Sequence, residues 1–303
     1  MSKRSSSFAW LSQDLAPRGV EMVMVSGLGN QLFQYAVGRA LATRLGLPLV
    51  LDISKLFLDP PYGYDLVHFA LGDQRVRDLP YRAWRARDRA LRVADAVRLP
   101  WMRYVTEPWP PALIDLSRVR GPSCLNGYWQ SYDYFSAVEP RLREELRFVT
   151  PPDAKTAACM EAIASSNAVA LHVRRGDYAE NPDTNAFHGL CGKPYYDAAL
   201  EIVLDKVGPS PSLFVVSDDA AWCRDNIRYP LPTTYVDWND KATSYNDMRL
   251  LSLCRGLVIA NSSFSWWASF LNAHRDKVVV APRRWFANGL ISDLPNAPWL
   301  TTI

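Results

Sequence analysis

The chain has 303 residues, of which 49% are hydrophobic and 21% are charged, and its formal net charge at pH 7 is +3. This size and composition are typical of a globular protein with one large or two medium-sized domains. The small net charge argues against wholesale binding of nucleic acid. No stretch approaches the roughly 20 consecutive apolar residues of a transmembrane helix. The N-terminal segment also lacks an apolar core of signal-peptide length, so we expect a cytoplasmic protein.

Five cysteines lie in the chain, and no two of them form a CxxC pair. Their odd number and wide spacing disfavour a disulfide framework and a zinc site. Such a pattern is typical of a protein in a reducing compartment, which agrees with the cytoplasm.

The first half predicts a strand, a helix and further strands. Val20 to Gly27 has the apolar composition of a buried strand, and the helical spacing that follows predicts a helix ending at Gly46. The stretch LPLVLDIS predicts a second strand, and Cys124 to Phe135 a strand with a loop. Thr150 to Lys155 is the best linker candidate, because its paired prolines stop the preceding helix.

The second half alternates short apolar strands with helices, which predicts a parallel sheet wrapped in helices. Strands are expected at Val169–Val173, Leu213–Ser217, Thr234–Asp237, Leu257–Ala260 and Lys277–Ala281. Helices are expected around Pro194–Lys206, Ala220–Asn226, Tyr245–Cys254 and Ser265–Asn272. Sheets of this kind bind ligands at the carboxyl ends of their strands, and three of these strands end in polar clusters.

Two adjacent arginines, Arg174 and Arg175, follow the first of these strands. Arginine resists burial unless it is paired, so the two residues require an anionic partner. One guanidinium group can form a fork onto phosphate oxygens, and Gly176 allows a ligand to approach the backbone. The alternative is an internal pair between the arginines and the chain's own carboxylates, which would support the loop. Asp177 can orient an arginine or accept a proton.

Acidic and hydroxyl residues follow two further strands. Asp218 and Asp219 stand where a helix begins, so they either cap this helix or accept hydrogen bonds from a ribose or a base. They are adjacent and lack the spacing of a DxD metal site, so we expect no metal requirement. Hydroxyl and amide groups gather at the start of the last predicted helix, a pattern typical of an anion site. These residues are Asn261, Ser262, Ser263 and Ser265.

The segment GLGNQ contains a G-x-G fragment without the third glycine of a dinucleotide loop, so it supports cofactor binding weakly. Gly27 and Gly29 still allow a ligand to approach the backbone, and Asn30 or Gln31 can donate hydrogen bonds to it. The alternative is a tight turn between strand and helix that Asn30 caps.

Two of the four histidines lie near these clusters. His172 lies within a predicted strand and is expected to be a hydrogen-bonded core residue. His188 lies in a polar loop and is a candidate for a substrate contact.

A basic amphipathic helix is predicted within Tyr81 to Arg103. Four arginines share one of its faces: Arg82, Arg85, Arg89 and Arg92. Such a helix either lies on an anionic membrane surface or covers the core with a solvated face.

These motifs together resemble those of the bacterial α-1,2-fucosyltransferases, glycosyltransferase family 11. The resemblance rests on GLGNQLFQYAVGRALA, NGYWQSYDYF, HVRRGDY, FHG, VVSDD and LLSLCRGLVIANSSFSWWASFLN, and extends from about Met22 to about Pro282. It implies a GDP-fucose donor, inversion at the anomeric carbon and no required metal. It also implies a GT-B-like fold of two Rossmann-like α/β domains with parallel sheets facing a cleft. We place these domains at residues 1–152, on the acceptor side, and 153–303, which bind GDP-fucose.

The resemblance also implies roles for the residues singled out above. Arg174 and Arg175 match the HxRRxD signature that contacts the donor's diphosphate, and Asp177 is the first candidate for the general base. The donor site would further include Asp218, Asp219, Asn261, Ser262, Ser263 and Ser265. Gly27, Gly29, Asn30, Gln31 and His188 would face the cleft on the acceptor side.

The implied acceptor is a galactose-terminated glycan, in some cases linked to a lipid. If the basic helix within Tyr81 to Arg103 lies on a membrane rather than over the core, the enzyme would contact the inner membrane peripherally. Two alternatives remain from the sequence. The first is a related enzyme with another donor or linkage, and the second is an inactive carbohydrate-binding protein.

Overall fold

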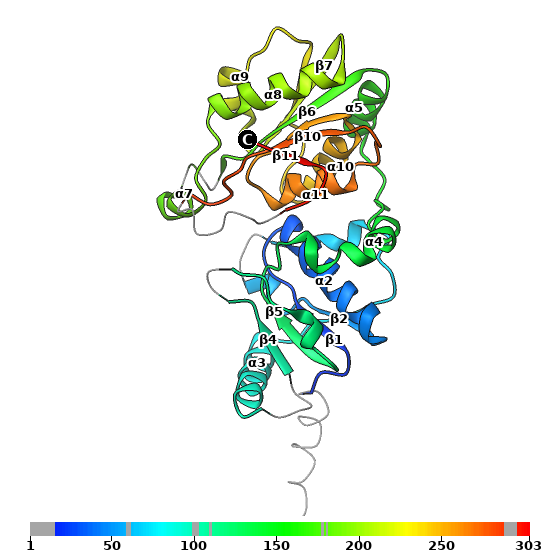
Figure 1. Ribbon diagram of the computed structural model, residues 1–303, viewed down its shortest axis with the longest axis vertical. Coiled ribbons are helices and arrows are strands. Elements are labelled where there is room, and N and C mark those ends of the chain that lie inside the picture. Colours follow the sequence, from blue (N-terminus) through cyan, green and yellow to red (C-terminus); the bar gives the residue numbers. More distant parts are fainter. Residues whose placement is uncertain are drawn as a thin grey trace, which may run out of the picture. The chain divides into compact units, whose positions relative to one another are not determined.

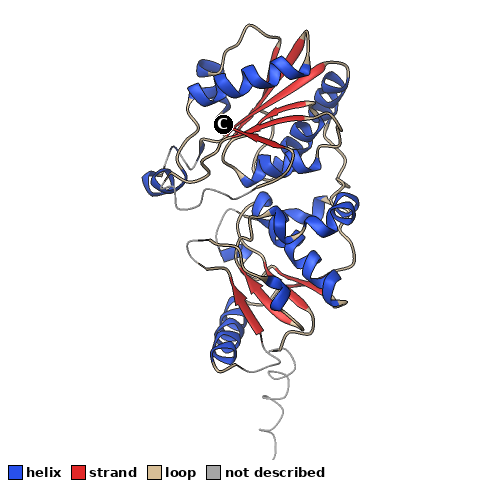
Figure 2. Ribbon diagram, viewed as in Figure 1, coloured by secondary structure: helices blue, strands red, loops and turns tan. Residues whose placement is uncertain are grey.

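The structure is a computed structural model, which describes residues 16–58, 62–98, 103–108, 111–176, 179, 181–287 and 296–303. The chain divides into two compact units, Met1–Arg147 and Phe148–Ile303. Each unit has a parallel sheet with helices packed against it (Figures 1 and 2). Two α/β units with parallel sheets are what the predicted GT-B-like fold class requires, and this part of the prediction is confirmed. In the described part of the chain, no helix is both long enough and apolar enough to cross a membrane.

The first unit contains a five-stranded sheet of order β3-β2-β1-β5-β4, and every pair in it is parallel. Its strands are β1 (Val20–Val23), β2 (Leu49–Asp52), β3 (Arg75–Arg77), β4 (Arg103–Thr106) and β5 (Ser123–Asn126). Its α-helices are α2 (Leu28–Leu45), α3 (Tyr81–Ala96) and α4 (Glu139–Glu145). Among the described residues of this unit, five short 3-10 helices also occur: η1 (Leu56–Leu58), η2 (Asp65–His68), η3 (Leu116–Arg118), η4 (Tyr132–Tyr134) and η5 (Ser136–Val138).

Helix α2 ends where the sequence predicts, at Gly46. This glycine has a φ of 64°, and its N–H group bonds the carbonyl groups of Ala42 and Thr43. A residue without a Cβ atom adopts this left-handed conformation at little cost and thereby stops the helix. The predicted first strand is shorter than expected: β1 ends at Val23, and the chain then turns at Ser26, which has a φ of 66°.

A buried ion cluster holds α3 against this sheet. Glu21 on the central strand is fully buried and accepts hydrogen bonds from Arg77, at 2.6 and 2.9 Å, and from Arg87 of α3. Arg87 also lies 3.8 Å from Asp52, whose pKa is raised by burial. A buried carboxylate is tolerated only when it is paired, so this cluster fixes which face of α3 turns inward.

The second unit contains a six-stranded sheet of order β11-β10-β9-β6-β7-β8, again with every pair parallel. Its strands are β6 (Asn167–Val173), β7 (Pro211–Ser217), β8 (Thr233–Val236), β9 (Gly256–Val258), β10 (Val278–Ala281) and β11 (Leu300–Thr302). Its helices are α5 (Ala154–Ala164), α7 (Pro182–His188), α8 (Lys193–Val207), α9 (Ala220–Asn226), α10 (Ser244–Leu253) and α11 (Ser263–Leu271). The five predicted strands and four predicted helices are all present, whereas α5, α7 and β11 had not been predicted.

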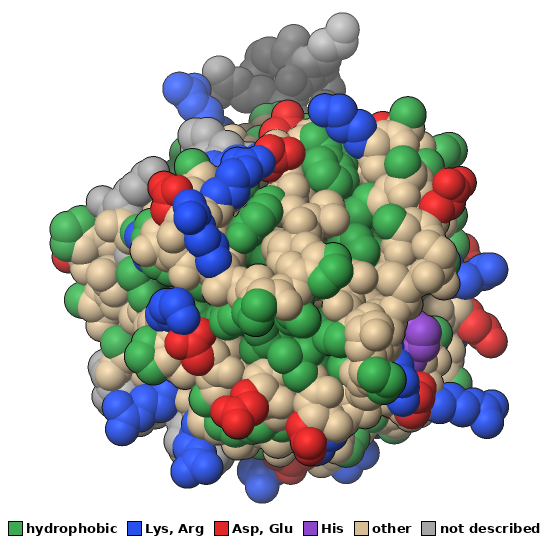
Figure 3. All heavy atoms as spheres, turned by 90° about the horizontal axis from the view of Figure 1, so that it is seen from above, with side chains coloured by type: hydrophobic (Ala, Val, Ile, Leu, Met, Phe, Trp, Pro, Cys, Tyr) green, Lys and Arg blue, Asp and Glu red, His purple; other side chains and the backbone are tan. Residues whose placement is uncertain are grey.

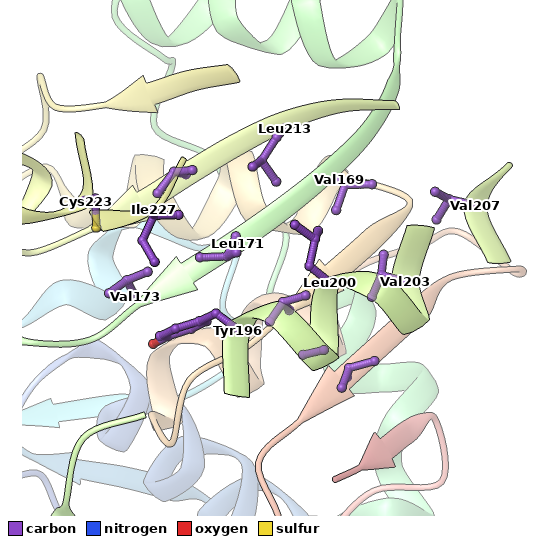
Figure 4. Close-up of a cluster of buried hydrophobic side chains, with 14 residues drawn as sticks. Val169, Leu171, Val173, Tyr196, Leu200, Val203, Val207, Leu213, Cys223 and Ile227 are labelled. Atoms are coloured by element: carbon purple, nitrogen blue, oxygen red, sulfur yellow. The ribbon is translucent and has the colours of Figure 1, made fainter. Parts of the chain in front are cut away.

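The core of the second unit explains why its strands are so apolar. Val169, Leu171 and Val173 alternate along β6 and pack against Tyr196 and Leu200 of α8 (Figure 4). The intervening residues of β6 point to the opposite face of the sheet, where other helices cover them. A strand that is buried on both faces needs apolar residues at nearly every position.

Candidate active site

The order of the second sheet brings three polar segments together. Strand β6 lies between β7 and β9, with Val173 paired to Ser217 and Leu171 paired to Val258. Because all three strands are parallel, the segments that follow them leave the sheet at the same edge. The arginine pair, the aspartate pair and the serine segment are therefore neighbours, as the sequence predicts.

Asp218 anchors the loop that carries the arginines. Its Oδ2 atom lies 2.7 Å from Nη1 of Arg174, and its Oδ1 atom accepts a hydrogen bond of 2.8 Å from the backbone N–H of Arg175. Gly176 passes so close that a Cβ atom there would lie 2.5 Å from Asp218 Oδ2. Only glycine fits this approach without moving the carboxylate.

Arg175 is held by a second carboxylate and an aromatic ring. Its Nε atom lies 3.3 Å from Oδ2 of Asp219, and its guanidinium carbon lies 3.9 Å from the ring centroid of Trp222. Asp219 also caps α9 by accepting the backbone N–H of Trp222 at 3.0 Å. The internal Arg–Asp pairs and the helix cap are thus both present. Neither terminal nitrogen of Arg175 bonds a residue within the described ranges, and 21% of this side chain is exposed.

The serine segment after β9 contributes a helix start. The Ser262 hydroxyl caps α11 by accepting the N–H of Phe264 at 3.3 Å, and Ser263 is the first residue of this helix. Ser265 is completely buried and donates to the Ser262 carbonyl. Asn261 is also buried, and its amide donates to the carbonyl of His188 at 2.9 Å. Ser265 and Asn261 therefore fix the shape of the segment, while Ser262 and Ser263 form its helical end.

The two histidines occupy different places in the second unit. His172 is buried beside Phe264, at a ring distance of 5.6 Å, and burial is the main reason that its pKa falls to about 4. Its Nδ1 atom has no hydrogen-bond partner in the described part of the chain. The predicted burial of His172 is therefore confirmed, but the predicted hydrogen bond is not found for this atom. His188 ends α7, meets the ring of Phe187 edge-on and lies tilted against the ring of Phe286. Asp177 lies outside the described residues.

The glycine segment of the first unit is built from amide side chains. Asn30 donates to the hydroxyl of Ser26 at 2.9 Å and accepts from Gln130 at 2.6 Å. Gln31 is fully buried and donates to the carbonyl groups of Ser26 and Gly63, at 2.9 and 2.8 Å. The Gln31 amide is thus occupied by the fold, where it ties a second loop to this segment.

The glycines of this segment are buried or closely packed. A Cβ atom on Gly27, which precedes α2, would lie 3.0 Å from the ring of Tyr62. Gly29 is buried in the first turn of the helix. The absence of side chains lets the loop of Tyr62 lie directly against the segment.

Two carboxyl groups lie near this segment, and sequence reasoning missed both. Asp65 is half-buried, its backbone N–H donates to Gln31 at 3.0 Å, and burial raises the pKa of its side chain to about 6. Its carboxyl group forms no hydrogen bond or ion pair with the residues that the structure describes. Glu107 follows β4 and accepts the N–H groups of Tyr128 and Trp129, at 2.7 and 3.1 Å. Burial raises the pKa of Glu107, although these two bonds oppose the shift.

The site residues do not form a metal centre of a usual kind. No group of three His, Cys, Asp or Glu side chains suited to a metal ion occurs among the described residues. The carboxylates of Asp218 and Asp219 are instead bonded to arginines.

Comparison with known proteins places the chain among glycosyltransferases. O-antigen biosynthesis glycosyltransferase WbnK of Escherichia coli is 40% identical over 137 residues, which cover 45% of this chain and 45% of that protein. An α-1,2-colitosyltransferase of E. coli is 28% identical over 296 residues, or 91% of this chain and 95% of that protein. Rabbit (Oryctolagus cuniculus) galactoside α-(1,2)-fucosyltransferase 2 is 25% identical over 80% of this chain and 64% of its own length.

The fold agrees with a solved structure and with a family model. NodZ, a fucosyltransferase from Bradyrhizobium, matches the structure with a TM-score of 0.50 at 17% identity, over 84% of this chain and 92% of NodZ. At this identity the likeness concerns the fold alone. The model of glycosyl transferase family 11 matches residues 100–299, which is about two thirds of the chain. The chain belongs to glycosyltransferase family 11, and it is an enzyme of glycosyl transfer.

Proposed function

We propose that this enzyme transfers L-fucose from GDP-fucose to O2 of a terminal β-galactoside, with inversion at the anomeric carbon. Its family supports sugar transfer, and relatives are named for α-1,2 transfer and for galactoside acceptors. We further propose that the acceptor is a surface glycan built on a lipid carrier, since one relative is named for O-antigen biosynthesis. The single observation that carries the proposal is the arginine pair at the carboxyl edge of the second sheet.

The arginines are suited to the leaving diphosphate. Breaking the bond between C1 of the sugar and the phosphate oxygen leaves additional negative charge on the β-phosphate of GDP. Arg174 and Arg175 would stabilise this charge through charge-assisted hydrogen bonds. Asp218, Asp219 and Trp222 hold the guanidinium groups before the donor arrives, so little reorganisation is needed at that moment. The start of α11 at Ser262 and Ser263 would add backbone N–H groups to the phosphate site.

No metal ion is needed in this mechanism. Two arginines supply the positive charge that a divalent cation supplies in other transferases. We therefore propose that transfer is independent of metal ions.

The acceptor hydroxyl requires a general base on the opposite face of the sugar from the phosphates. An oxocarbenium-like sugar is attacked from that face, which gives inversion. Asp177 of the arginine signature remains one proposed base. Asp65 is a second, because its carboxyl group has no partner within the described ranges and its pKa of about 6 suits proton transfer near neutral pH.

The direct test is incubation of the purified enzyme with GDP-fucose and a panel of β-galactosides. We expect a product heavier by one deoxyhexose, with an α-1,2 linkage in linkage analysis. Products with another linkage, or fucose transfer to none of the panel, would contradict the proposal.

A second donor has a specific observation in its favour. One relative, which aligns over 91% of this chain and 95% of its own length, is named as an α-1,2-colitosyltransferase, and colitose is fucose without its 3-hydroxyl group. GDP-colitose should therefore be assayed beside GDP-fucose. A higher kcat/KM with GDP-colitose than with GDP-fucose would leave the proposed linkage unchanged and make GDP-colitose the preferred donor.

A further inference from the structure

Helix α3 presents a face of one charge sign to solvent. Arg82, Arg85 and Arg89 are all exposed, while Arg87, Leu91 and Ala94 are buried on the opposite side of the helix. Residues three, four and seven positions apart share a helical face, so the three exposed arginines form one stripe. The ion pair between Arg87 and Glu21 on the buried side keeps this stripe turned toward solvent.

The structure separates the four arginines that the sequence groups together. Arg92 pairs with Asp88 at 2.8 Å and lies over the ring of Tyr104, 4.9 Å from its centroid, so it belongs to the fold. Arg85 contacts only the hydroxyl of Tyr81, at 3.5 Å, within the described part of the chain. Arg82 and Arg89 form no ion pair with any residue that the structure describes.

Apolar side chains lie beside this stripe. Val93 and Val97 are 57% and 63% exposed, although valine is usually buried. At the start of the helix, the ring of Tyr81 is 46% exposed and stacks on Trp84 with 6.2 Å between centroids. Tyrosine and tryptophan are enriched where proteins meet the membrane interface.

We propose that the surface formed by Arg82, Arg85, Arg89, Val93 and Val97, the α3 face, binds the anionic surface of a lipid bilayer. The arginines match the negative charge of the headgroups, and the two valines can enter the boundary between headgroups and acyl chains. Exposed valines have no comparable role in binding a nucleic acid, because its phosphate groups would contact the arginines alone. The face of the molecule seen in Figure 3 differs from the α3 face in its charge, because basic and acidic side chains are interspersed on it.

The expected strength follows from the number of arginines. Each basic residue near an anionic membrane strengthens binding about fivefold, so three of them contribute on the order of 100-fold. Binding should weaken at high salt, because screening shortens the reach of these charges. Such a contact is reversible, unlike that of a membrane-spanning helix.

The test measures flotation of the full-length protein with vesicles and does not depend on its catalytic activity. Vesicles of phosphatidylcholine alone are compared with vesicles that also contain phosphatidylglycerol, at low and high salt. The variant R82Q/R85Q/R89Q is compared with R118Q/R120Q/R228Q, which removes the same charge from three other exposed arginines. Both sets of residues are on the surface, and circular dichroism confirms that each variant is folded.

We expect binding only to the anionic vesicles, about 100-fold weaker for the α3 variant and nearly unchanged for the control. Equal loss in both variants would assign the effect to net charge and overturn the proposal. So would failure of the wild-type protein to bind anionic vesicles.

A second variant separates the membrane from a nucleic acid. V93T/V97T keeps the shape and charge of the helix but makes the two exposed side chains polar. We expect it to weaken vesicle binding severalfold. Unchanged vesicle binding by V93T/V97T, with binding of single-stranded RNA that depends on the three arginines, would overturn the membrane proposal in favour of a nucleic-acid surface.

Discussion

The carboxyl edge of the second sheet and the glycine segment of the first unit are polar in opposite ways. The second unit gathers full charges, Arg174 and Arg175 against Asp218 and Asp219. The first unit gathers amide groups bonded to one another and to the backbone, and the carboxyl group of Asp65 has no cation beside it within the described ranges. A fixed cationic cluster suits a diphosphate, whereas neutral amides and a carboxyl group of raised pKa suit a neutral sugar and proton transfer. Two parallel sheets thus provide different chemistry through the residues at their edges.

The largest expected effect concerns the proposed base. D65N should lower transfer by ~100- to 10,000-fold, because a general base contributes a factor of that size. The affinity for GDP should stay unchanged. D177N is the matched comparison, since both substitutions remove one carboxylate. Wild-type turnover by D65N would assign the base elsewhere, with Asp177 as the remaining proposal.

The pH dependence sharpens the same point. The base must be ionised, so kcat/KM should fall as the pH drops below about 6, the pKa of Asp65. Because this folded-state pKa lies above the unfolded value, the protonated side chain favours folding at low pH, and that stability is lost as the pH rises through about 6. D65N should therefore raise the Tm at pH 7.5 but leave it nearly unchanged at pH 4. A change in Tm that does not depend on pH would contradict the raised pKa.

The arginine pair comes next in size. Arg175→Ala should lower transfer and GDP affinity by about 30- to 1000-fold, or on the order of 2–4 kcal/mol, with Arg174→Ala close behind. Arg224 pairs with Asp237 on the surface of the same unit, so R224A serves as the control. Calorimetry with GDP separates binding from turnover. If Arg174→Ala and Arg175→Ala both fold and keep near-wild-type activity, the charged edge of the second sheet does not bind the diphosphate.

A smaller effect is expected where the backbone approaches Asp218. Gly176→Ala would place a Cβ atom 2.5 Å from the carboxylate oxygen that holds Arg174, so the carboxylate must shift. We expect about a tenfold loss of GDP affinity, because the arginines lose their fixed orientation. Gly121→Ala is the control, since an added Cβ atom there meets nothing within 4 Å. Equal affinities for all three proteins would show that Asp218 does not position the arginines.

The smallest expected effect is that of chelation. Transfer should be unchanged in excess EDTA if the arginines provide all the positive charge at the diphosphate. The measurement is the initial rate with and without EDTA. A loss that Mg²⁺ or Mn²⁺ restores would mean that the charged edge needs a cation as well.

The sequence by itself determined the parallel sheet of the second unit and the positions of its polar clusters. Apolar runs such as Val169–Val173 and Leu213–Ser217 are local signals, and a parallel sheet brings the residues after them to one edge whatever the details of packing. Gly46 likewise ends α2 through its own backbone freedom. These features depend on neighbours in the sequence, so local patterns were sufficient to predict them.

Only the tertiary structure decided which partner each polar group takes. It turns Arg87 inward to Glu21 while Arg82 stays exposed, and it occupies the Gln31 amide with Gly63. It also leaves Asp65 half-buried, with a carboxyl group that has no partner among the described residues. Strand β11 was also missed, because its three residues gain stability from the register with β10 and carry almost no periodicity of their own. Each of these outcomes depends on groups that are far apart in the chain. Burial and pairing of such groups are set by long-range packing, which the order of residue types does not reveal.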